Sequence, residues 1–162
     1  MNTSFERSST KGKEEWLTPP AILKALGVFD LDPCAPTKRP WDTAKRHYTQ
    51  KEDGLKQPWF GRVFMNPPYG SKTQVWMQKL KEHGNGIALI FARTETQNYF
   101  DHIWHDADAI LFLKGRLTFY HVSGKPATEP AGAPSVLVAY GKRNATVLKN
   151  AKLEGKFIQL KP

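Results

Sequence analysis

Apolar residues along this chain gather in short runs separated by polar turns, and the runs predict strands. Residues 87–92, which read IALIFA, are uninterruptedly apolar, as in strands that helices cover on both faces. Residues 62–65, which read RVFM, form a second buried run that leads directly into a proline-rich turn. Further strands are predicted at residues 28–32, 44–49, 109–113, 117–120 and 135–140.

Apolar residues at helical spacing predict three helices between these strands. Thr18 is a candidate N-cap for the first, with Pro19 at a position where a missing N–H costs nothing and Gly27 at its end. The second helix covers residues 73–82. The third covers residues 94–104, where a threonine followed three residues later by glutamine forms a capping box.

Strands that alternate with helices and end in an all-strand section predict an α/β fold. We expect a mainly parallel sheet with helices on both faces and a C-terminal antiparallel hairpin. Residues 1–15 are polar and are expected to be a flexible N-terminal segment, and residues 16–162 a single domain. Ligands of such sheets bind at the carboxyl ends of the strands, where the segments 32–33 and 66–69 are expected to lie.

The amino-acid composition indicates a nucleic-acid partner. The 162 residues carry 24 Lys and Arg against 15 Asp and Glu, a net charge of +9. This balance suits a polyanion, most simply nucleic acid, although a merely basic soluble protein shares it. The single cysteine, Cys34, excludes an intramolecular disulfide and a multi-cysteine zinc site. No apolar run is long enough to span a membrane and no signal peptide is visible, so a cytoplasmic protein is expected.

The tetrapeptide Asn66-Pro67-Pro68-Tyr69 carries the most specific chemistry. Its two prolines lock the backbone, which fixes the direction of the Pro67 carbonyl. The Asn66 side-chain oxygen is a second acceptor nearby, and together the two suit the N–H groups of a planar amino group. Accepting both N–H groups favours a pyramidal nitrogen whose lone pair can attack. Tyr69 offers a flat face on which a heteroaromatic ring can stack.

Several blocks in a fixed order resemble one family. They are WLTP at 16–19, DLDPCA at 30–35, EDGL at 52–55, WFGRVFMNPPYG at 59–70 and ARTET at 92–96. In this order they resemble the phage-type DNA N6-adenine methyltransferases (the phage Dam family), over about residues 16–141. The resemblance implies a Rossmann-like fold and methyl transfer from S-adenosylmethionine to the N6 of adenine in DNA, with the adenine flipped out of the duplex.

The resemblance also assigns residues to roles. Asp32-Pro33 takes the place of the glycine-rich loop of most such enzymes, and no F-x-G-x-G sequence is present. The catalytic residues are expected to be Asn66, Pro67, Pro68 and Tyr69. The cofactor-binding residues are expected to be Thr18, Pro19, Asp32, Pro33, Asp53 and Asn66. A solvated turn residue is nearly as good an interpretation of Asp53.

The expected substrate-binding residues are inferred from their position in the predicted fold and from their charge. Arg93 follows the apolar strand 87–92 and so lies at the carboxyl edge, where it is expected to contact DNA or to form a structural salt bridge. The expected substrate-binding residues are Tyr69, Arg93, Arg116 and Lys125. No metal site is expected, because His102 and His105 lack a third ligand and are interpreted as an exposed helical face.

The expected partner is double-stranded DNA, recognised at a short sequence such as GATC. The chain has no room for a separate recognition domain, so the loops 36–58 and 121–134 are expected to read the DNA. The resemblance implies a phage or prophage enzyme in the bacterial cytoplasm, monomeric or weakly dimeric, with restriction-modification as an expected context. Two alternatives stay open: a methyltransferase of RNA or a protein amide, and a catalytically silent DNA-binding domain on this scaffold.

Overall fold

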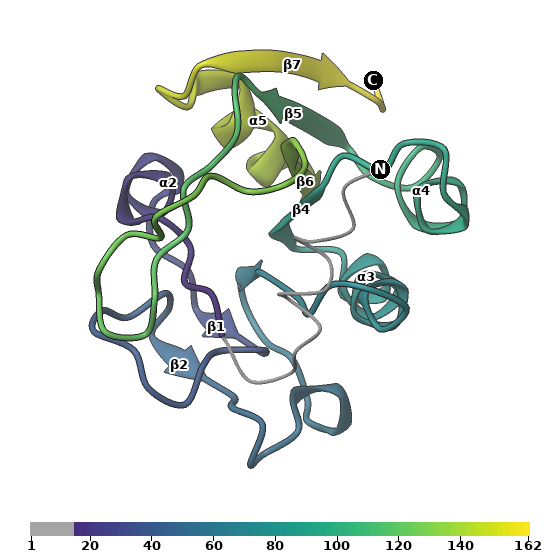
Figure 1. The fold of residues 1–162 in the computed structure, drawn as a ribbon. Coiled ribbons are helices and arrows are strands. Elements are labelled where there is room, and N and C mark those ends of the chain that lie inside the picture. The colour runs from purple at the N-terminus through teal and green to yellow at the C-terminus, as the bar shows by residue number, and fades with distance from the viewer. Residues whose placement is uncertain (1–14) are drawn as a thin grey trace.

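One seven-stranded sheet forms the centre of the computed structural model, which describes residues 15–162 (Figure 1). The expectation for residues 1–15 therefore lies outside the described residues except at Glu15. The strand order is β2-β1-β3-β4-β6-β5-β7. The strands are β1 (Leu31–Asp32), β2 (Arg46–His47), β3 (Val63–Met65), β4 (Gly86–Phe91), β5 (Ala109–Leu113), β6 (Ser135–Tyr140) and β7 (Gly155–Gln159).

The sheet is mixed, so the prediction of a mainly parallel sheet is not confirmed. Strands β2, β1, β3 and β4 pair in parallel, whereas β4 with β6, β6 with β5 and β5 with β7 pair antiparallel. The expected antiparallel pairing near the C-terminus exists between β5 and β6. However, β6 inserts between β4 and β5, and β7 adds a further antiparallel edge strand.

Helices cover both faces of the sheet, as the sequence predicts (Figure 1). They are α2 (Pro20–Leu26), α3 (Thr73–His83), α4 (Gln97–His102) and α5 (Lys142–Asn150). Within β4, alternate side chains face opposite ways: Ile87 and Leu89 pack with α2 and α5, and Ala88 and Ile90 with α3 and α4. This two-sided burial explains the continuous apolar run. No helix in residues 15–162 is long and apolar enough to cross a membrane.

Two of the predicted strands are shortened or missing. Only residues 31–32 of the run 28–32 pair, because Val28 is 69% exposed and precedes the ladder. Residues 117–120 do not form a regular strand, and Tyr120 makes only isolated bridges to Leu17 and Pro126. Apolar character at these sites reflects packing of loops onto the core and not pairing within the sheet.

Helix starts also differ from the sequence prediction by a few residues. Thr18 is not an N-cap, since Pro19 occupies that position before α2 and no side chain caps the helix. Thr96, not Thr94, precedes α4, which is shorter than predicted at 97–102. Gly27 does end α2, in a positive-φ conformation (φ 86°) that favours glycine.

Helix α5 and strand β7 were not predicted, because neither shows a strong apolar pattern. The side chains of α5 that lie buried are Asn144, Ala145 and Leu148, and β7 is an edge strand with mostly exposed residues. A buried polar network fixes α5 to the sheet: Arg62 Nε donates to Asn144 Oδ1 (2.7 Å), and Asn144 Nδ2 donates to Asn85 Oδ1 (2.8 Å).

Candidate active site

The predicted motifs meet where the order of the strands reverses direction. From β1 the chain adds β2 on one side and then returns to place β3 on the other side of β1. In α/β sheets such a switch point, at the carboxyl ends of the strands, is where ligands bind. Asp32 ends β1, and Asn66 directly follows β3. The topology therefore predicts a binding site between these two residues.

The turns after β1 and β3 touch each other at this edge. The thiol of Cys34 lies within hydrogen-bonding reach of the backbone N–H of Asn66. Burial, together with the nearby Asp32 carboxylate, raises the pKa of Cys34 well above its ordinary value. A protonated thiol is a poor nucleophile, so Cys34 has a packing role in joining the two turns.

Thr18 reaches Asn66 from the segment before α2. The amide nitrogen of Asn66 donates a hydrogen bond to the Thr18 hydroxyl (3.3 Å), and Thr18 is only 2% exposed. Using the nitrogen in this contact leaves Oδ1 of Asn66 available as an acceptor. Pro19 is buried beside Thr18. The structure thus brings the Thr18-Pro19 segment to Asn66, although Thr18 and Asn66 lie 48 residues apart in the sequence.

Asp32 is engaged by its own loop. At 3% exposure, its carboxylate accepts hydrogen bonds from the Thr43 hydroxyl and from the Cys34 backbone N–H (3.1 Å). Burial raises the pKa of Asp32 to about 6, while Thr43, Cys34 and the Arg39 charge act in the opposite direction. Asp32 thereby joins the 32–34 turn to the 39–47 loop.

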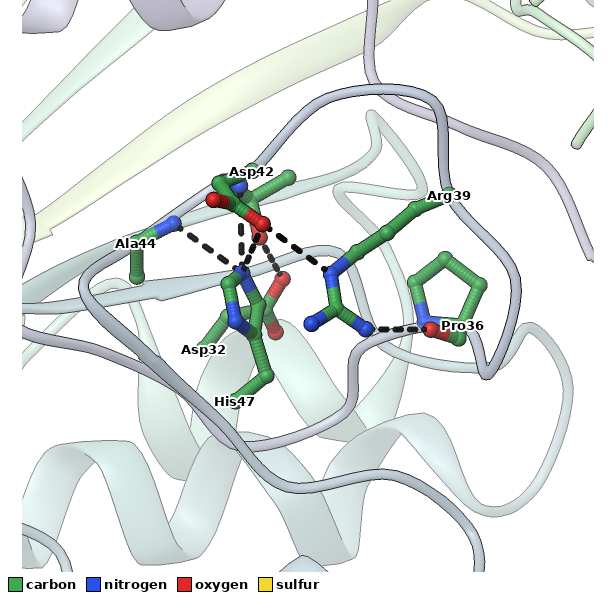
Figure 2. A network of polar contacts seen from close by, with 7 residues as sticks. Asp32, Pro36, Arg39, Asp42, Ala44 and His47 are labelled. Carbon is green, nitrogen blue, oxygen red and sulfur yellow. Dashed lines mark hydrogen bonds and ion pairs between the residues drawn. The ribbon is translucent and has the colours of Figure 1, made fainter.

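His47 completes this loop from strand β2 (Figure 2). Its Nε2 accepts hydrogen bonds from the backbone N–H groups of Thr43 (3.2 Å) and Ala44 (3.3 Å). A nitrogen that accepts two N–H bonds carries no proton, and burial and then Arg39 lower the pKa of His47. Arg39 donates to the Pro36 carbonyl (3.1 Å) and pairs with Asp42 (3.5 Å), whose carboxylate also lies 3.9 Å from His47 Nε2 (Figure 2).

The turn containing Asp53 packs against Pro33. Asp53 has a left-handed backbone (φ 57°), a conformation that costs energy for a non-glycine residue and is often found at functional sites. Gly54 follows it, at a place where a Cβ would come within 1.8 Å of the Pro33 carbonyl oxygen. The Asp53 side chain is 44% exposed and lies 3.8 Å from Lys56. This turn therefore packs on the 32–34 turn through Gly54, while the Asp53 carboxylate stays partly exposed.

Lys79 of α3 holds the same turn in place. Its ammonium group donates to the carbonyls of Leu55 (2.7 Å), Gln57 (2.7 Å) and Gly54 (3.4 Å). It also lies 5.2 Å from the centre of the Trp59 ring. The helical pattern includes the aliphatic stem of Lys79, but the sequence does not predict these contacts of its ammonium group.

Tyr69 differs from the sequence expectation in one respect. Its ring stacks on Phe91, with 4.1 Å between centroids and 5° between planes, so only its other face is available to a base. The hydroxyl is buried without a hydrogen-bond partner among the described residues, and burial raises its pKa. Pro68 anchors the next helix, because its carbonyl accepts a hydrogen bond from Thr73 (2.6 Å).

A cavity of about 430 Å³ lies beside Tyr69, between the first turns of α3 and α4 and the end of β4. Aromatic rings of Tyr69, Phe91 and Tyr99 line it together with the amides of Gln74 and Asn98. Asn98 Oδ1, like the Tyr69 hydroxyl, is buried with no hydrogen-bond partner in residues 15–162. The described residues that line the cavity also include Gly70, Thr73, Ile90, Arg93, Thr96 and Gln97, and among them Arg93 carries a charge.

Arg116 and Lys125 lie elsewhere, on the loop 114–134. Arg116 donates to the Gly132 carbonyl (2.9 Å), and the backbone of Lys125 closes a turn with His121 (2.9 Å); both side chains are exposed. Neither lines the cavity. This loop packs on the 36–44 loop, since Trp41 meets Tyr120 edge to face at 5.4 Å. The two predicted DNA-reading loops are therefore in contact.

The histidine pair of α4 is not the exposed face that the sequence predicts. His102 is buried, and burial and then Lys81 lower its pKa, whereas His105 is exposed. Helix α4 ends at His102, so the two residues do not share one helical face. Among residues 15–162, no group of three or more His, Cys, Asp or Glu side chains is arranged to hold a metal ion.

Sequence reasoning missed the residues that support the site. Thr43 and His47 shape the loop around Asp32, and Asn98 lines the cavity. None of them belongs to a recognisable motif. Only their contacts in the folded chain identify them.

Comparison with known proteins gives one match. A family model described as DNA N-6-adenine-methyltransferase (Dam) matches residues 7–153, which is most of the chain. No curated protein and no solved structure matches.

Proposed function

The chain belongs to the DNA N-6-adenine-methyltransferase (Dam) family, and on that premise we propose that it transfers a methyl group from S-adenosylmethionine to adenine N6 in double-stranded DNA. The observation that carries the proposal is the position of Asn66-Pro67-Pro68-Tyr69 at the switch point of the sheet. We further propose that the sheet is a variant of the Rossmann-like methyltransferase fold, with residues 16–162 as one domain.

The side chains at the switch point fit the cofactor. S-adenosylmethionine has a ribose diol and an amino group, which carboxylates bind, and the half-exposed Asp53 carboxylate, on the turn that packs against Pro33, would be such a group. Asn66 would form part of the surface that meets the cofactor, the buried Pro19 and Pro33 would fix the adjoining backbone, and Asp32 would hold the turn that carries Pro33. The buried Thr18 would support this site through Asn66. When bound there, the cofactor supplies an electrophilic methyl group.

The cavity beside Tyr69 fits a nucleotide better than the cofactor. Among residues 15–162 its lining includes the cation Arg93 and no carboxylate, so these residues offer no acidic partner for a sulfonium or an ammonium group. A flipped base could stack on aromatic walls and hydrogen-bond to amides, with its phosphate near Arg93. We place the target adenine at the entrance of this cavity, on the free face of Tyr69.

Catalysis in this proposal needs orientation and two acceptors. Asn66 Oδ1 and the Pro67 carbonyl oxygen would accept the two N–H groups of the target amine. The nitrogen lone pair, less delocalised into the ring, would then be free to attack the methyl group that the cofactor would supply, with the thioether as leaving group. The proton lost by the nitrogen would pass to solvent, because the Asp32 carboxylate is taken up by Thr43 and Cys34.

DNA recognition is proposed to come from the two loops that pack together, 36–58 and 121–134. Lys125 and Arg116 would contact phosphates from the second loop. A short target such as GATC, action in the cytoplasm of a bacterial host and a phage or prophage origin rest on the family resemblance alone. A net charge of +9 favours a nucleic acid over a protein amide as substrate.

A substrate competition tests the proposal. The full chain is incubated with methyl-labelled S-adenosylmethionine and equal masses of adenine-unmethylated duplex DNA, RNA and a protein mixture. We expect N6-methyladenine in the DNA, with sequencing to identify the methylated sites. Label in RNA or in glutamine side chains would overturn the DNA assignment. Cofactor binding with no label in any pool would favour the silent DNA-binding domain.

A further inference from the structure

The side-chain amide of Asn66 can adopt two orientations, and its neighbour Thr18 can select one of them. One end of an amide side chain is an acceptor and the other a donor, and a half-turn about its last bond exchanges them. Only the Oδ1 end can accept an N–H from an amino group. This inference rests on the proposed function. If that function holds, an Asn66 side chain with Nδ2 facing the substrate would set its N–H donors against the N–H donors of the target amine.

We propose that Thr18 is a positioning residue that keeps the oxygen of Asn66 turned toward the substrate. The Thr18 hydroxyl accepts a hydrogen bond from Asn66 Nδ2 at 3.3 Å. This bond occupies the donor end of the amide and leaves the acceptor end for the target amine. Thr18 acts through Asn66 and forms no bond to the reacting atoms.

The surrounding backbone holds Thr18 rigidly enough for this role. The preceding residue, Leu17, exchanges two hydrogen bonds with Tyr120: its N–H donates to the Tyr120 carbonyl (2.8 Å), and the Tyr120 N–H donates back (3.1 Å). The following residue, Pro19, has a fixed φ of −55° and is buried. The hydroxyl therefore stays close to Asn66 without a contribution from α2, which begins only at Pro20.

Burial separates this role from cofactor binding. Thr18 is 2% exposed, so it offers almost no surface to a ligand, and its side chain does not cap α2. Its hydroxyl forms a hydrogen bond with the amide of Asn66. Loss of the hydroxyl should therefore change the chemical step and leave the affinity for S-adenosylmethionine intact.

A double-mutant cycle distinguishes positioning from a general structural role. Thr18→Val keeps the shape and removes the hydroxyl, and Thr18→Ser keeps the hydroxyl. In an Asn66→Asp background both ends of the side chain are oxygen acceptors, so a half-turn changes nothing. If Thr18 positions Asn66, Thr18→Val should lower kcat when Asn66 is present. In the Asn66→Asp background the same substitution should leave kcat almost unchanged.

The measurements are kcat on duplex DNA, the S-adenosylmethionine dissociation constant and the melting temperature. We expect Thr18→Val to lower kcat about fivefold, the effect of one ordinary hydrogen bond, with unchanged cofactor affinity. Thr18→Ser should restore kcat, and in the Asn66→Asp background the change should be about twofold or less. The matched control is Thr146→Val, which removes a hydroxyl bonded to the Lys142 carbonyl on α5.

Equal kcat losses in both backgrounds would overturn the proposal, as would weaker cofactor binding with kcat retained or no loss at all. A second measurement does not need activity: the Asn66 Nδ2 protons, observed by NMR, should exchange faster in Thr18→Val than in the wild-type chain. Unchanged exchange would also overturn it. Absence of N6-methyladenine from the wild-type reaction would instead refute the proposed function, and the NMR result would still decide the role of Thr18.

Discussion

At the residue scale, the two motif side chains at the switch point serve different purposes. Asn66 keeps an acceptor available, whereas the carboxylate of Asp32 is taken up by Thr43 and Cys34. A buried carboxylate with neutral partners gains less from ionisation than one in water. Asp32 is therefore a structural element of the site, and burial raises its pKa to about 6.

The stability of the protein should reflect this titration. The folded-state pKa of Asp32, raised from 3.8 to about 6, means that the folded chain holds the proton more tightly than the unfolded chain. The resulting stabilisation is fully present below about pH 4 and is lost as the pH rises through 6. Relative to Asp32→Asn, the wild-type unfolding free energy should fall by on the order of 3 kcal/mol over this window.

Urea unfolding of both proteins between about pH 4 and pH 7 measures this difference. The amide of Asp32→Asn can still accept from the Cys34 N–H and donate to the Thr43 hydroxyl, so the variant should fold. His47 titrates in both proteins with the opposite sign and cancels in the comparison. If the unfolding free energies of the two proteins changed in parallel with pH, the raised pKa of Asp32 would be contradicted.

Sequence reasoning found the motif residues but not the partners that orient them. The residues Asn66 to Tyr69 were recognisable because two prolines beside an amide and an aromatic ring are an unusual combination. The contact between Thr18 and Asn66 joins positions 48 residues apart, and no local pattern encodes it. The stacking of Tyr69 on Phe91 likewise depends on the side-by-side packing of β3 and β4.

At the element scale, the best-predicted parts are those with a buried face of regular period. Strand β4 and helix α3 have long apolar patterns, and both are found where the sequence places them. Helix α5 was missed because its docking uses Asn144, a polar residue that bonds to Arg62, Asn85 and the Tyr140 carbonyl. Polar docking of this kind is invisible to a hydrophobic pattern.

The hydrogen bonds from Lys79 of α3 to the turn that follows Asp53 lead to a second prediction. Lys79→Met removes three hydrogen bonds to carbonyls and the contact with Trp59 while keeping the aliphatic stem. We expect a loss of about 1–2 kcal/mol of unfolding free energy, because Lys79 is only half-buried and water can replace part of its bonding. The cofactor should also bind more weakly, since the turn presents Asp53.

Thermal unfolding and equilibrium binding of S-adenosylmethionine measure these two effects. The matched control is Lys72→Met, a substitution with the same change in charge at an exposed residue just before α3. If both variants melt at the same temperature and bind the cofactor equally well, Lys79 does not hold the turn.

At the scale of the whole molecule, the direction of each strand was the hardest feature to predict. The apolar run 135–140 predicts a strand, but its sequence does not predict that β6 inserts antiparallel between β4 and β5. Pairing partners are chosen by contacts between distant segments, which a local pattern does not contain. The edge strand β7 is mostly exposed and so lacks even the apolar run.

Net charge is a property of the whole chain, and it predicts the salt dependence of DNA binding. With +9 charges and a duplex substrate, association should release condensed counterions from the phosphates. If six or more phosphates are contacted, affinity for a short duplex should fall by about 10³-fold between 50 and 200 mM salt. Fluorescence anisotropy measures this slope, and an affinity independent of salt would argue against phosphate contacts.

The most direct test of the central claim is mass spectrometry of nucleosides from duplex DNA treated with the wild-type chain or Asn66→Ala. Asn66 would accept an N–H of the target amine, so the wild-type reaction should yield N6-methyladenine and Asn66→Ala should yield at least about 100-fold less. Equal binding of S-adenosylmethionine by both proteins would show that the loss lies in the chemistry. N6-methyladenine formed at the same rate by both would contradict the account.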